Sequence, residues 1–477
     1  MKLYSQSQNS KLYQGDMREL NSIIANNSID AIITDPPYEL NFMNKGWDNS
    51  GIAFQKETWE KCYQVLKPGG YLLAFGGSRT FHRIACAIED AGFEIRDTIM
   101  WLYGSGFPHS MDIGKAVESK VLNGNANTQA FKHLRGTKAV AGNWGINKNV
   151  AQQGCRPTNY DLDKHERTVD VEYQTNEGLR WNGWGTALKP SYEPIIVARK
   201  PCDGSCTDNI LKYGVGGLNI DECRIGNETI KGGTMPDFRD VGQKSKMAIG
   251  IDKLSFGQVE NAERIPLADH IGRFPANTIL TYDEADFDEV CGALPRNDRP
   301  NGSITKKYKI NNQVYGEYGY CNEWEAYQDS GSAARYFYCA KASKKDRDEG
   351  CDFLEGGTLH RVNGGHGLED SSKFAPVARK NTHPTVKPTE LMQYLVRLVA
   401  PNGATILDPF MGSGSTGKAV MYENAERKKD YKFIGIELTE EYLPIAKARV
   451  ENIKIEKNDQ PCLKTEPIYE QLTIEDI

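Results

Sequence analysis

Four consecutive residues, Asp35-Pro36-Pro37-Tyr38, combine groups that could hold a flat ring by its amino group. The Asp35 carboxylate and the Pro36 carbonyl can both accept hydrogen bonds from one amine, and the Tyr38 ring can stack on a planar base. Two successive prolines stiffen the backbone and cannot continue a β-ladder, so the chain must turn away from any sheet here. An ordinary turn after a strand is the alternative, because Asp-Pro commonly opens turns.

A second stretch that could bind a ligand follows the apolar run 405–407. It reads Asp408-Pro409-Phe410-Met411-Gly412-Ser413-Gly414. Glycines let backbone amides approach a ligand, and the helix expected next would offer its N-terminus to an anionic group. Residues 412–418 nearly form a phosphate-binding loop, but Ala419 stands where that motif needs Ser or Thr to hold magnesium. The sequence therefore disfavours an ATPase or GTPase.

One further acid, Glu437, ends the next apolar run at 433–436. An acid at that position of a βα unit can bind ribose hydroxyls, which indicates an adenosine-like ligand. A surface acid before a helix would look the same in the sequence.

The segments around these residues alternate between strand-like and helix-like patterns. Strands are expected at 11–13, 31–34, 71–75, 93–102, 193–198, 405–407 and 433–436, and helices at 17–25, 58–66, 81–91, 391–399 and 440–453. Such alternation predicts a mostly parallel sheet with helices on both faces. Ligands bind at the carboxyl ends of the strands in such sheets, which is where Asp35, Asp408 and Glu437 fall.

Composition limits the classes of protein that remain. The 477 residues carry a net charge of −6, so any contact with nucleic acid must come from local basic patches. Eleven scattered cysteines indicate reduced thiols, and their spacing matches no zinc site. No apolar run is long enough to span a membrane, and the polar first residues lack a signal-peptide core, so we expect a cytoplasmic protein without a membrane partner.

Taken together, these motifs resemble those of the DNA amino-methyltransferases, which use S-adenosylmethionine. The catalytic motif of that family, Asp/Asn/Ser-Pro-Pro-Tyr, is matched at 35–38, and its cofactor loop, Asp-Pro-Phe-x-Gly-Ser-Gly, at 408–414. The segment His383-Pro384-Thr385-x-Lys387-Pro388 also resembles the one that precedes this loop. Because the catalytic motif comes first, the order resembles the beta group, whose methyltransferase fold is circularly permuted.

The resemblance covers about 1–110, 185–200 and 376–455, and it implies how the chain divides. A large region between the two motifs is expected to recognise the target, and its basic clusters are interleaved with aromatic residues, as on a nucleic-acid surface. A solvated charged face explains any single cluster equally well. The expected segments are a catalytic half of the core at 1–106, an insertion between sheet strands at 107–185, a core strand in 186–200, a target-recognition region at 201–375, a cofactor-binding half at 376–455 and a tail at 456–477.

The function implied by the resemblance is site-specific methylation of double-stranded DNA. The target base would be flipped out of the duplex, and its amino group would attack the methyl group directly, with no metal. Asp at the first motif position favours adenine N6 as the acceptor; cytosine N4, or an amino group in RNA, is the alternative. A non-catalytic DNA-binding protein with a decayed site is disfavoured by the complete Asp-Pro-Pro-Tyr.

The resemblance also assigns roles to individual residues. The catalytic residues would be Asp35, Pro36, Pro37 and Tyr38, and S-adenosylmethionine would be bound by Asp16, Thr385, Lys387, Asp408, Pro409, Phe410, Gly412, Ser413, Gly414 and Glu437. Among partners besides DNA, the sequence leaves both a homodimer and a cognate restriction endonuclease open. It does not reveal which DNA sequence is recognised.

Overall fold

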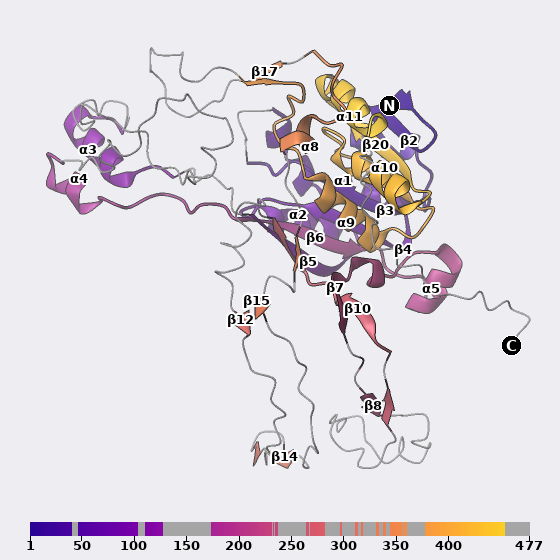
Figure 1. Cartoon of the computed structure of the whole chain (residues 1–477). Coiled ribbons are helices and arrows are strands. Elements are labelled where there is room, and N and C mark those ends of the chain that lie inside the picture. Colours follow the sequence, from indigo (N-terminus) through magenta and orange to yellow (C-terminus); the bar gives the residue numbers. More distant parts are fainter. Residues whose placement is uncertain are drawn as a thin grey trace, which may run out of the picture.

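One ten-stranded sheet forms the centre of the molecule, in the order β1-β2-β20-β19-β3-β4-β6-β5-β11-β16 (Figure 1). This is a computed structural model. It describes residues 1–40, 46–103, 110–126, 173–230, 268–281 and 377–453, with short segments at 232, 234–236, 264–266, 296–297, 311–312, 316–317, 331–332, 337–339, 344–355 and 357–359.

The first hundred residues build one half of the sheet. Its strands are β1 (Lys2–Gln6), β2 (Ser10–Gln14), β3 (Ile29–Thr34), β4 (Leu66–Phe75) and β5 (Glu94–Tyr103), and its helices are α1 (Lys56–Val65) and α2 (Phe81–Asp90). Every residue of β3 is buried, as its continuous apolar run predicts for a parallel strand that is covered on both faces.

The last described segment completes the sheet. It contributes α9 (Thr389–Val399), β19 (Thr405–Asp408), α10 (Ser415–Arg427), β20 (Lys432–Glu437) and α11 (Leu443–Glu451). Strand β19 pairs in parallel with β3 on one side and with β20 on the other, and β20 pairs in parallel with β2. The hairpin β1-β2 therefore joins the sheet through a strand that lies more than 400 residues later in the chain.

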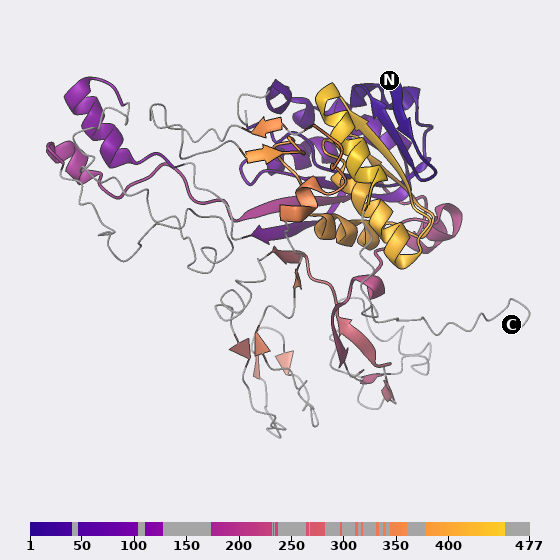
Figure 2. The same cartoon turned by 45° about the horizontal axis from the view of Figure 1, so that its top comes forward.

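Helices cover both faces of this sheet (Figures 1 and 2). Helices α9, α10 and α11 pack on one face around Leu395, Val420 and Leu443. On the other face, α1 and α2 pack around Trp59 and Ile88. Only β1 and β6 run against the other eight strands, so the expected mostly parallel α/β fold is confirmed.

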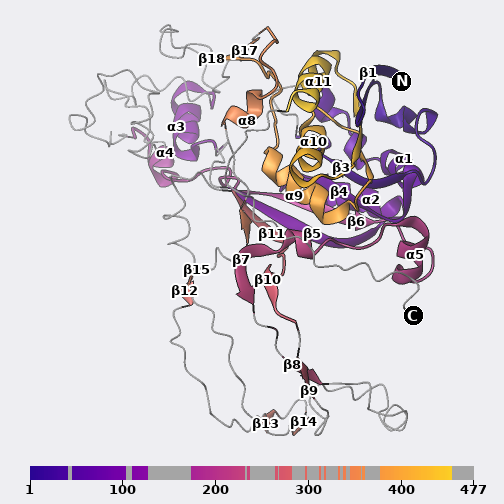
Figure 3. The ribbon, with the colours of Figure 1, turned by 45° about the vertical axis from the view of Figure 1, so that its right-hand side comes forward.

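Strand β6 (Tyr192–Arg199) lies antiparallel between β4 and β5. Its pairing with the strand that ends near Leu102 was expected, and Leu102 is opposite Tyr192. The described ends of the segment between β5 and β6 carry α3 (Ile113–Asn123) and α4 (Asn176–Arg180), which pack on each other away from the sheet (Figure 3). Residues 127–172 of the predicted insertion lie outside the described residues.

Parts of the predicted target-recognition region belong to the core. Strand β11 (Thr278–Thr281) pairs in parallel with β5, and β16 (Tyr338–Cys339) pairs with β11. Helix α5 (Cys206–Tyr213) packs on β4. The expected division at residue 201 therefore does not coincide with an edge of the sheet.

Short antiparallel pairs from the same region project from the sheet, below it in Figure 1. They are β7 (Ile225–Ile230) with β10 (His270–Arg273), β8 (Thr234–Pro236) with β9 (Arg264–Pro266), β12 (Arg296–Asn297) with β15 (Gly331–Ser332) and β13 (Asn311–Asn312) with β14 (Gly316–Glu317). A further pair, β17 (Gly357–Leu359) with β18 (Val377–Arg379), leads back to the core.

The basic clusters of this region lie in the sequence at 306–309 and at 341–347. The one at 306–309 lies outside the described residues. In the other, Arg347 of α8 (Lys344–Asp348) donates a hydrogen bond to the backbone carbonyl of His383 and thus contacts the core.

Three predicted elements differ from those observed. The helix expected at 440–453 is a 3-10 helix over Glu440–Tyr442 followed by α11. The helix expected at 17–25 is a 3-10 helix over Met17–Ser22. Strand β4 begins at Leu66, not at Tyr71, because its Pro-Gly-Gly run forms an irregularity in which Gly69 donates to the Lys200 carbonyl. Within the described part of the chain, no helix has both the length and the apolarity that crossing a membrane would require.

Candidate active site

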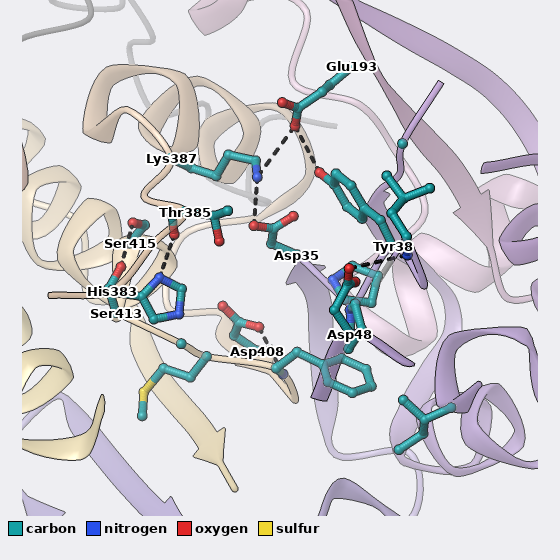
Figure 4. Close-up of a pocket in the computed structure, with 18 of the residues that line it drawn as sticks. Asp35, Tyr38, Asp48, Glu193, His383, Thr385, Lys387, Asp408, Ser413 and Ser415 are labelled. Carbon is teal, nitrogen blue, oxygen red and sulfur yellow. Dashed lines mark hydrogen bonds and ion pairs between the residues drawn. The ribbon is translucent and has the colours of Figure 1, made fainter. Parts of the chain in front are cut away.

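A cavity of 1430 Å³ opens at the carboxyl ends of the central parallel strands (Figure 4). It is lined by thirteen of the fourteen residues predicted for the site: Asp16, Asp35, Pro36, Pro37, Tyr38, Thr385, Lys387, Asp408, Pro409, Phe410, Gly412, Ser413 and Glu437. Gly414 is absent from the lining. It precedes α10 with φ +76°, and a Cβ there would approach the Ala446 backbone to 3.1 Å, so this glycine serves packing.

Asp408 joins the two halves of the site. Its carboxylate accepts hydrogen bonds from the hydroxyls of Thr34, at the end of β3, and Thr416, in α10, both at 2.7 Å. The Phe410 backbone N–H donates to it as well, at 3.2 Å. Burial raises the pKa of Asp408 to about 7, although these hydrogen bonds oppose the shift. The buried carboxyl therefore fixes the end of β19 against the end of β3.

Asp35 has one oxygen engaged and one free. Lys387 Nζ lies 2.6 Å from Asp35 Oδ2, whereas Oδ1 is buried and has no hydrogen-bond partner among the described residues. Leaving a buried acceptor unsatisfied costs about 1–3 kcal/mol, so such atoms are rare and commonly mark functional sites. Oδ1 is thus a buried acceptor that the described residues leave unsatisfied, on a side chain that lines the cavity.

Tyr38 is fixed from a distant strand. Its hydroxyl donates to Glu193 Oε2 of β6 at 2.8 Å, and burial, together with the charges of Asp35 and Glu193, raises the pKa of the phenol well above its usual value. The loop that follows is tied by Asp48, whose carboxylate accepts from the backbone N–H groups of Glu39 and Leu40 at 2.9 and 3.2 Å. The contacts of Glu193 and Asp48 therefore hold the Tyr38 ring in place where it lines the cavity.

The glycine loop after β19 is closely packed. Gly412 has φ +52°, and a Cβ there would lie 2.9 Å from Nε2 of His383. The ring of His383 donates from Nδ1 to the Thr385 carbonyl at 2.6 Å, and burial lowers its pKa to about 4, so the imidazole is neutral. Only glycine fits at position 412 without moving this ring.

Glu437 braces the same loop from β20. Its carboxylate oxygens accept from the backbone N–H groups of Gly412 at 2.8 Å and Thr439 at 2.7 Å. Burial raises the pKa of Glu437. Each oxygen can still accept another hydrogen bond, and both belong to a cavity-lining residue.

Asp16 lines the cavity as the N-cap of the 3-10 helix. It accepts from the Arg18 backbone N–H at 2.9 Å and pairs with the Arg18 guanidinium, whose hydrogen bonds lower the pKa of Asp16. Its carboxylate is therefore ionised and held at the mouth of the site.

The near match to a phosphate-binding loop has a structural explanation. A phosphate loop turns its lysine toward the ligand, but Lys418 is buried and paired with Asp346 at 2.5 Å and Glu349 at 3.0 Å. Ser413 and Ser415 are likewise engaged by the buried guanidinium of Arg449 at 3.0 Å. The side chains of this loop hold the loop to α8 and α11.

The cavity is large, and six acidic residues line it. Its volume exceeds the usual range of about 300–1000 Å³ for a single small-molecule site. Its acidic lining complements a positive charge, and two of its cationic side chains, Arg18 and Lys387, are already neutralised by carboxylates. The acidic residues are Asp16, Asp35, Asp48, Glu193, Asp408 and Glu437.

Sequence reasoning missed several residues of this site, among them Asp48, Thr416, Glu193, His383 and Thr34. Glu193 and His383 line the cavity, and Thr34 connects its two halves. Glu193 could have been noticed as an acid within the largely apolar stretch 192–199. His383 could have been noticed because it begins the family-like segment 383–388. Thr34 immediately precedes Asp35 but looks like any β-branched strand residue.

Comparison with known proteins identifies the family. A family model described as DNA methylase, for N6 and N4 methyltransferases, matches residues 29–201 and 237–448, which is well over half of the chain. The chain therefore belongs to this DNA methylase family.

Individual relatives match over smaller parts of the chain. The type II methyltransferase M.HpaI of Haemophilus parainfluenzae is 40% identical over 86 residues, which are 17% of this chain and 27% of that protein. M2.LlaDCHI of Lactococcus lactis subsp. cremoris, also a type II methyltransferase, is 26% identical over 245 residues, 46% of this chain and 82% of its own. The matched part of M.HpaI is thus about a quarter of its length. Among solved structures, the cytosine-N4-specific PvuII DNA methyltransferase aligns with 95% of this chain and 91% of its own at 13% identity and a TM-score of 0.38.

Proposed function

We propose that this member of the DNA methylase family transfers a methyl group from S-adenosylmethionine to the N6 amino group of an adenine flipped out of double-stranded DNA. The observation that carries the proposal is the buried Oδ1 of Asp35, which has no partner among the described residues and belongs to a side chain that lines the same cavity as Gly412 and Glu437. Asp at the first position of the catalytic motif supports adenine as the target.

The chain's own groups hold the target amine. Asp35 Oδ1 and the Pro36 carbonyl accept its two N–H bonds, which favours a pyramidal nitrogen whose lone pair is turned toward the methyl donor. Tyr38 stacks on the flipped base, and its hydroxyl contact with Glu193 fixes the plane of the ring. Catalysis then depends on positioning and on fixed charges more than on proton transfer.

The opposite wall of the cavity holds the methyl donor. S-adenosylmethionine supplies a methyl group on a positively charged sulfur, which keeps the bonding electron pair when the new N–C bond forms. Glu437 accepts hydrogen bonds from ribose hydroxyls, Asp16 faces the adenine ring, and the loop that includes Phe410 and Gly412 encloses the methionine portion. The methylated nitrogen takes over the positive charge and loses one proton to solvent, so the amine is neutral again.

Two measurements test this function. Unmethylated genomic DNA is incubated with the protein and tritiated S-adenosylmethionine, digested to nucleosides and separated. We expect label in N6-methyladenine; label in N4-methylcytosine would overturn the base assignment, and label only with an RNA substrate would overturn DNA as the target. Asp35→Ala should abolish transfer while the affinity for S-adenosylmethionine survives, and retained transfer would remove Asp35 from the mechanism.

A further inference from the structure

Lys387 is wedged among the groups that hold the target amine (Figure 4). Its ammonium lies 2.6 Å from Asp35 Oδ2 and 3.4 Å from Glu193 Oε2. The rings of Tyr38 and Phe75 lie under the same nitrogen, with centroids at 5.4 and 5.0 Å. The resemblance to the methyltransferases assigned this lysine to S-adenosylmethionine, whose methionine carboxylate is the group that a cation would bind.

The cluster is built from three separate parts of the chain. Asp35 and Tyr38 follow β3, Glu193 belongs to β6, and Lys387 precedes α9. Glu193 Oε2 receives both the Tyr38 hydroxyl, at 2.8 Å, and the weaker contact of Lys387. One carboxylate oxygen therefore fixes the aromatic ring and the ammonium together.

Burial and charge make this arrangement costly to disturb. The side chain of Lys387 is 8% exposed. Burial opposes its charge, but Asp35 and Glu193 outweigh that effect and raise the pKa of the ammonium, so Lys387 remains cationic. Two carboxylates and one ammonium leave a net charge of −1, which suits a nitrogen that becomes positive as it is methylated.

We propose that Lys387 and Glu193 are positioning residues for the amine-holding site, and that Lys387 is committed to Asp35 and not to the cofactor carboxylate. Lys387 occupies Asp35 Oδ2 and turns Oδ1 toward the target amine, while Glu193 holds Lys387 and the Tyr38 ring in register. This inference rests on the proposed methyl transfer and specifies how its site is oriented.

The proposal predicts a specific dependence on pH. Without the ammonium, the cluster would hold two acids with no counter-charge, so it should take up a proton and lose activity at a higher pH. The acid limb of the pH–rate profile should therefore move upward. The other titratable groups that interact with Asp35, Glu193 or Lys387 are Tyr38, Tyr103, His383 and Asp408.

The experiment compares Lys387→Met with a matched control, Lys67→Met. Lys67 Nζ lies 2.6 Å from Asp30 Oδ1 at the other end of the same strand, outside the cavity lining. Methyl transfer to unmethylated genomic DNA is measured in a single turnover with saturating S-adenosylmethionine. We expect Lys387→Met to lose about 100-fold in rate, the usual cost of a misplaced reacting group, and Lys67→Met to lose less than about twofold.

Binding separates the two roles of the lysine. S-adenosylhomocysteine carries the methionine carboxylate, and 5′-methylthioadenosine lacks it. Lys387→Met should bind both with wild-type affinity, which also shows that the variant is folded. A tenfold loss of affinity for S-adenosylhomocysteine alone would assign Lys387 to the cofactor and overturn the proposal.

Charge-retaining and charge-removing variants complete the test. Lys387→Arg should return the acid limb to its wild-type position without full rate, because guanidinium keeps the charge but not the geometry. Glu193→Gln keeps an acceptor for Tyr38 and should lose about tenfold in rate with unchanged binding of both nucleosides. An unshifted profile and wild-type rate in Lys387→Met would refute the inference alone, whereas no transfer by the wild-type protein would refute the proposed function.

Discussion

The two ends of strand β3 carry the same kind of ion pair but leave different atoms free. At the amino end, Asp30 receives Lys67 on Oδ1 at 2.6 Å and the Thr405 backbone N–H on Oδ2 at 2.8 Å. At the carboxyl end, Asp35 receives Lys387 on Oδ2, also at 2.6 Å, and Oδ1 has no partner in the described structure. Both carboxylate oxygens of Asp30 therefore have a partner, whereas only one oxygen of Asp35 has a partner among the described residues.

The difference separates an aspartate whose two oxygens are both bound from the one that we propose holds the target amine. Both pairs join β3 to a neighbouring element, so the ion pair itself does not distinguish them. The distinguishing feature is the buried oxygen that the fold leaves unsatisfied at a tolerated cost of about 1–3 kcal/mol. A ligand that donates a hydrogen bond there would recover this energy, so the proposed function places the amine at the carboxyl end of β3 and not at the amino end.

Exchanging Asp35 for Asn should have the largest effect. The amide keeps the size of the side chain but loses the charge, and its NH₂ group cannot accept from an amine. We expect the rate of methyl transfer to fall by more than about 1000-fold, and the affinity for S-adenosylmethionine to stay within a factor of two. A rate loss of less than tenfold would mean that the free oxygen is not used.

Asp408 offers a pH test of the carboxyl end. Its pKa in the folded protein is about 7, above the ordinary value of 3.8, so between these values the folded state holds a proton that the unfolded chain has released. Its contribution to stability should therefore fall as the pH rises from about 4 to 7, by at most about 4 kcal/mol. The free energy of unfolding in urea, measured at pH 5 and pH 8, should drop less in Asp408→Asn than in the wild type, and equal drops would contradict the shift.

Exchanging Asp30 for Ala tests the amino end. It leaves Lys67 and the Thr405 N–H without their acceptor, so we expect the free energy of unfolding to fall by about 2 kcal/mol. The rate per folded molecule should stay within about twofold of wild type. If the rate fell as far as in Asp35→Asn, Asp30 would contribute to methyl transfer as much as Asp35, and the two ends of β3 would not differ in function.

The smallest effect is expected for Thr34→Val. This exchange removes the hydroxyl that donates to Asp408 at 2.7 Å and keeps the shape of the side chain. Since Phe410 N–H and Thr416 still donate to the same carboxylate, urea unfolding should show a loss of about 1 kcal/mol. A loss above about 3 kcal/mol would show that this one contact holds the halves together.

Local patterns were enough to predict much of this fold and site. Asp35, Asp408 and Glu437 each follow a short apolar run, and parallel strands bring such positions to one edge, so all three line one cavity. The helix stripe at 391–399 matches α9, because periodic apolar positions in one segment determine which face is buried.

What the sequence could not provide depends on distant partners. Glu193 reaches Tyr38 only because β6 inserts antiparallel between β4 and β5. Strand β4 extends beyond the strand predicted at 71–75 back to Leu66, since Lys200 and Asn209 supply hydrogen-bond partners to its Pro-Gly-Gly run. Lys387 was placed by family resemblance near the cofactor, but its contacts with Asp35 and Glu193 arise only when three segments meet.

The position of β19 and β20 also affects how this protein is made. While a ribosome is still synthesising the middle of the chain, one edge of β3 is exposed and the β1-β2 hairpin has no neighbouring strand, because both await β19 and β20. Pairings across so many residues form slowly. The nascent chain should therefore emerge with unpaired strand edges that can bind other chains. Chaperone binding should decrease only after residue 437 leaves the exit tunnel.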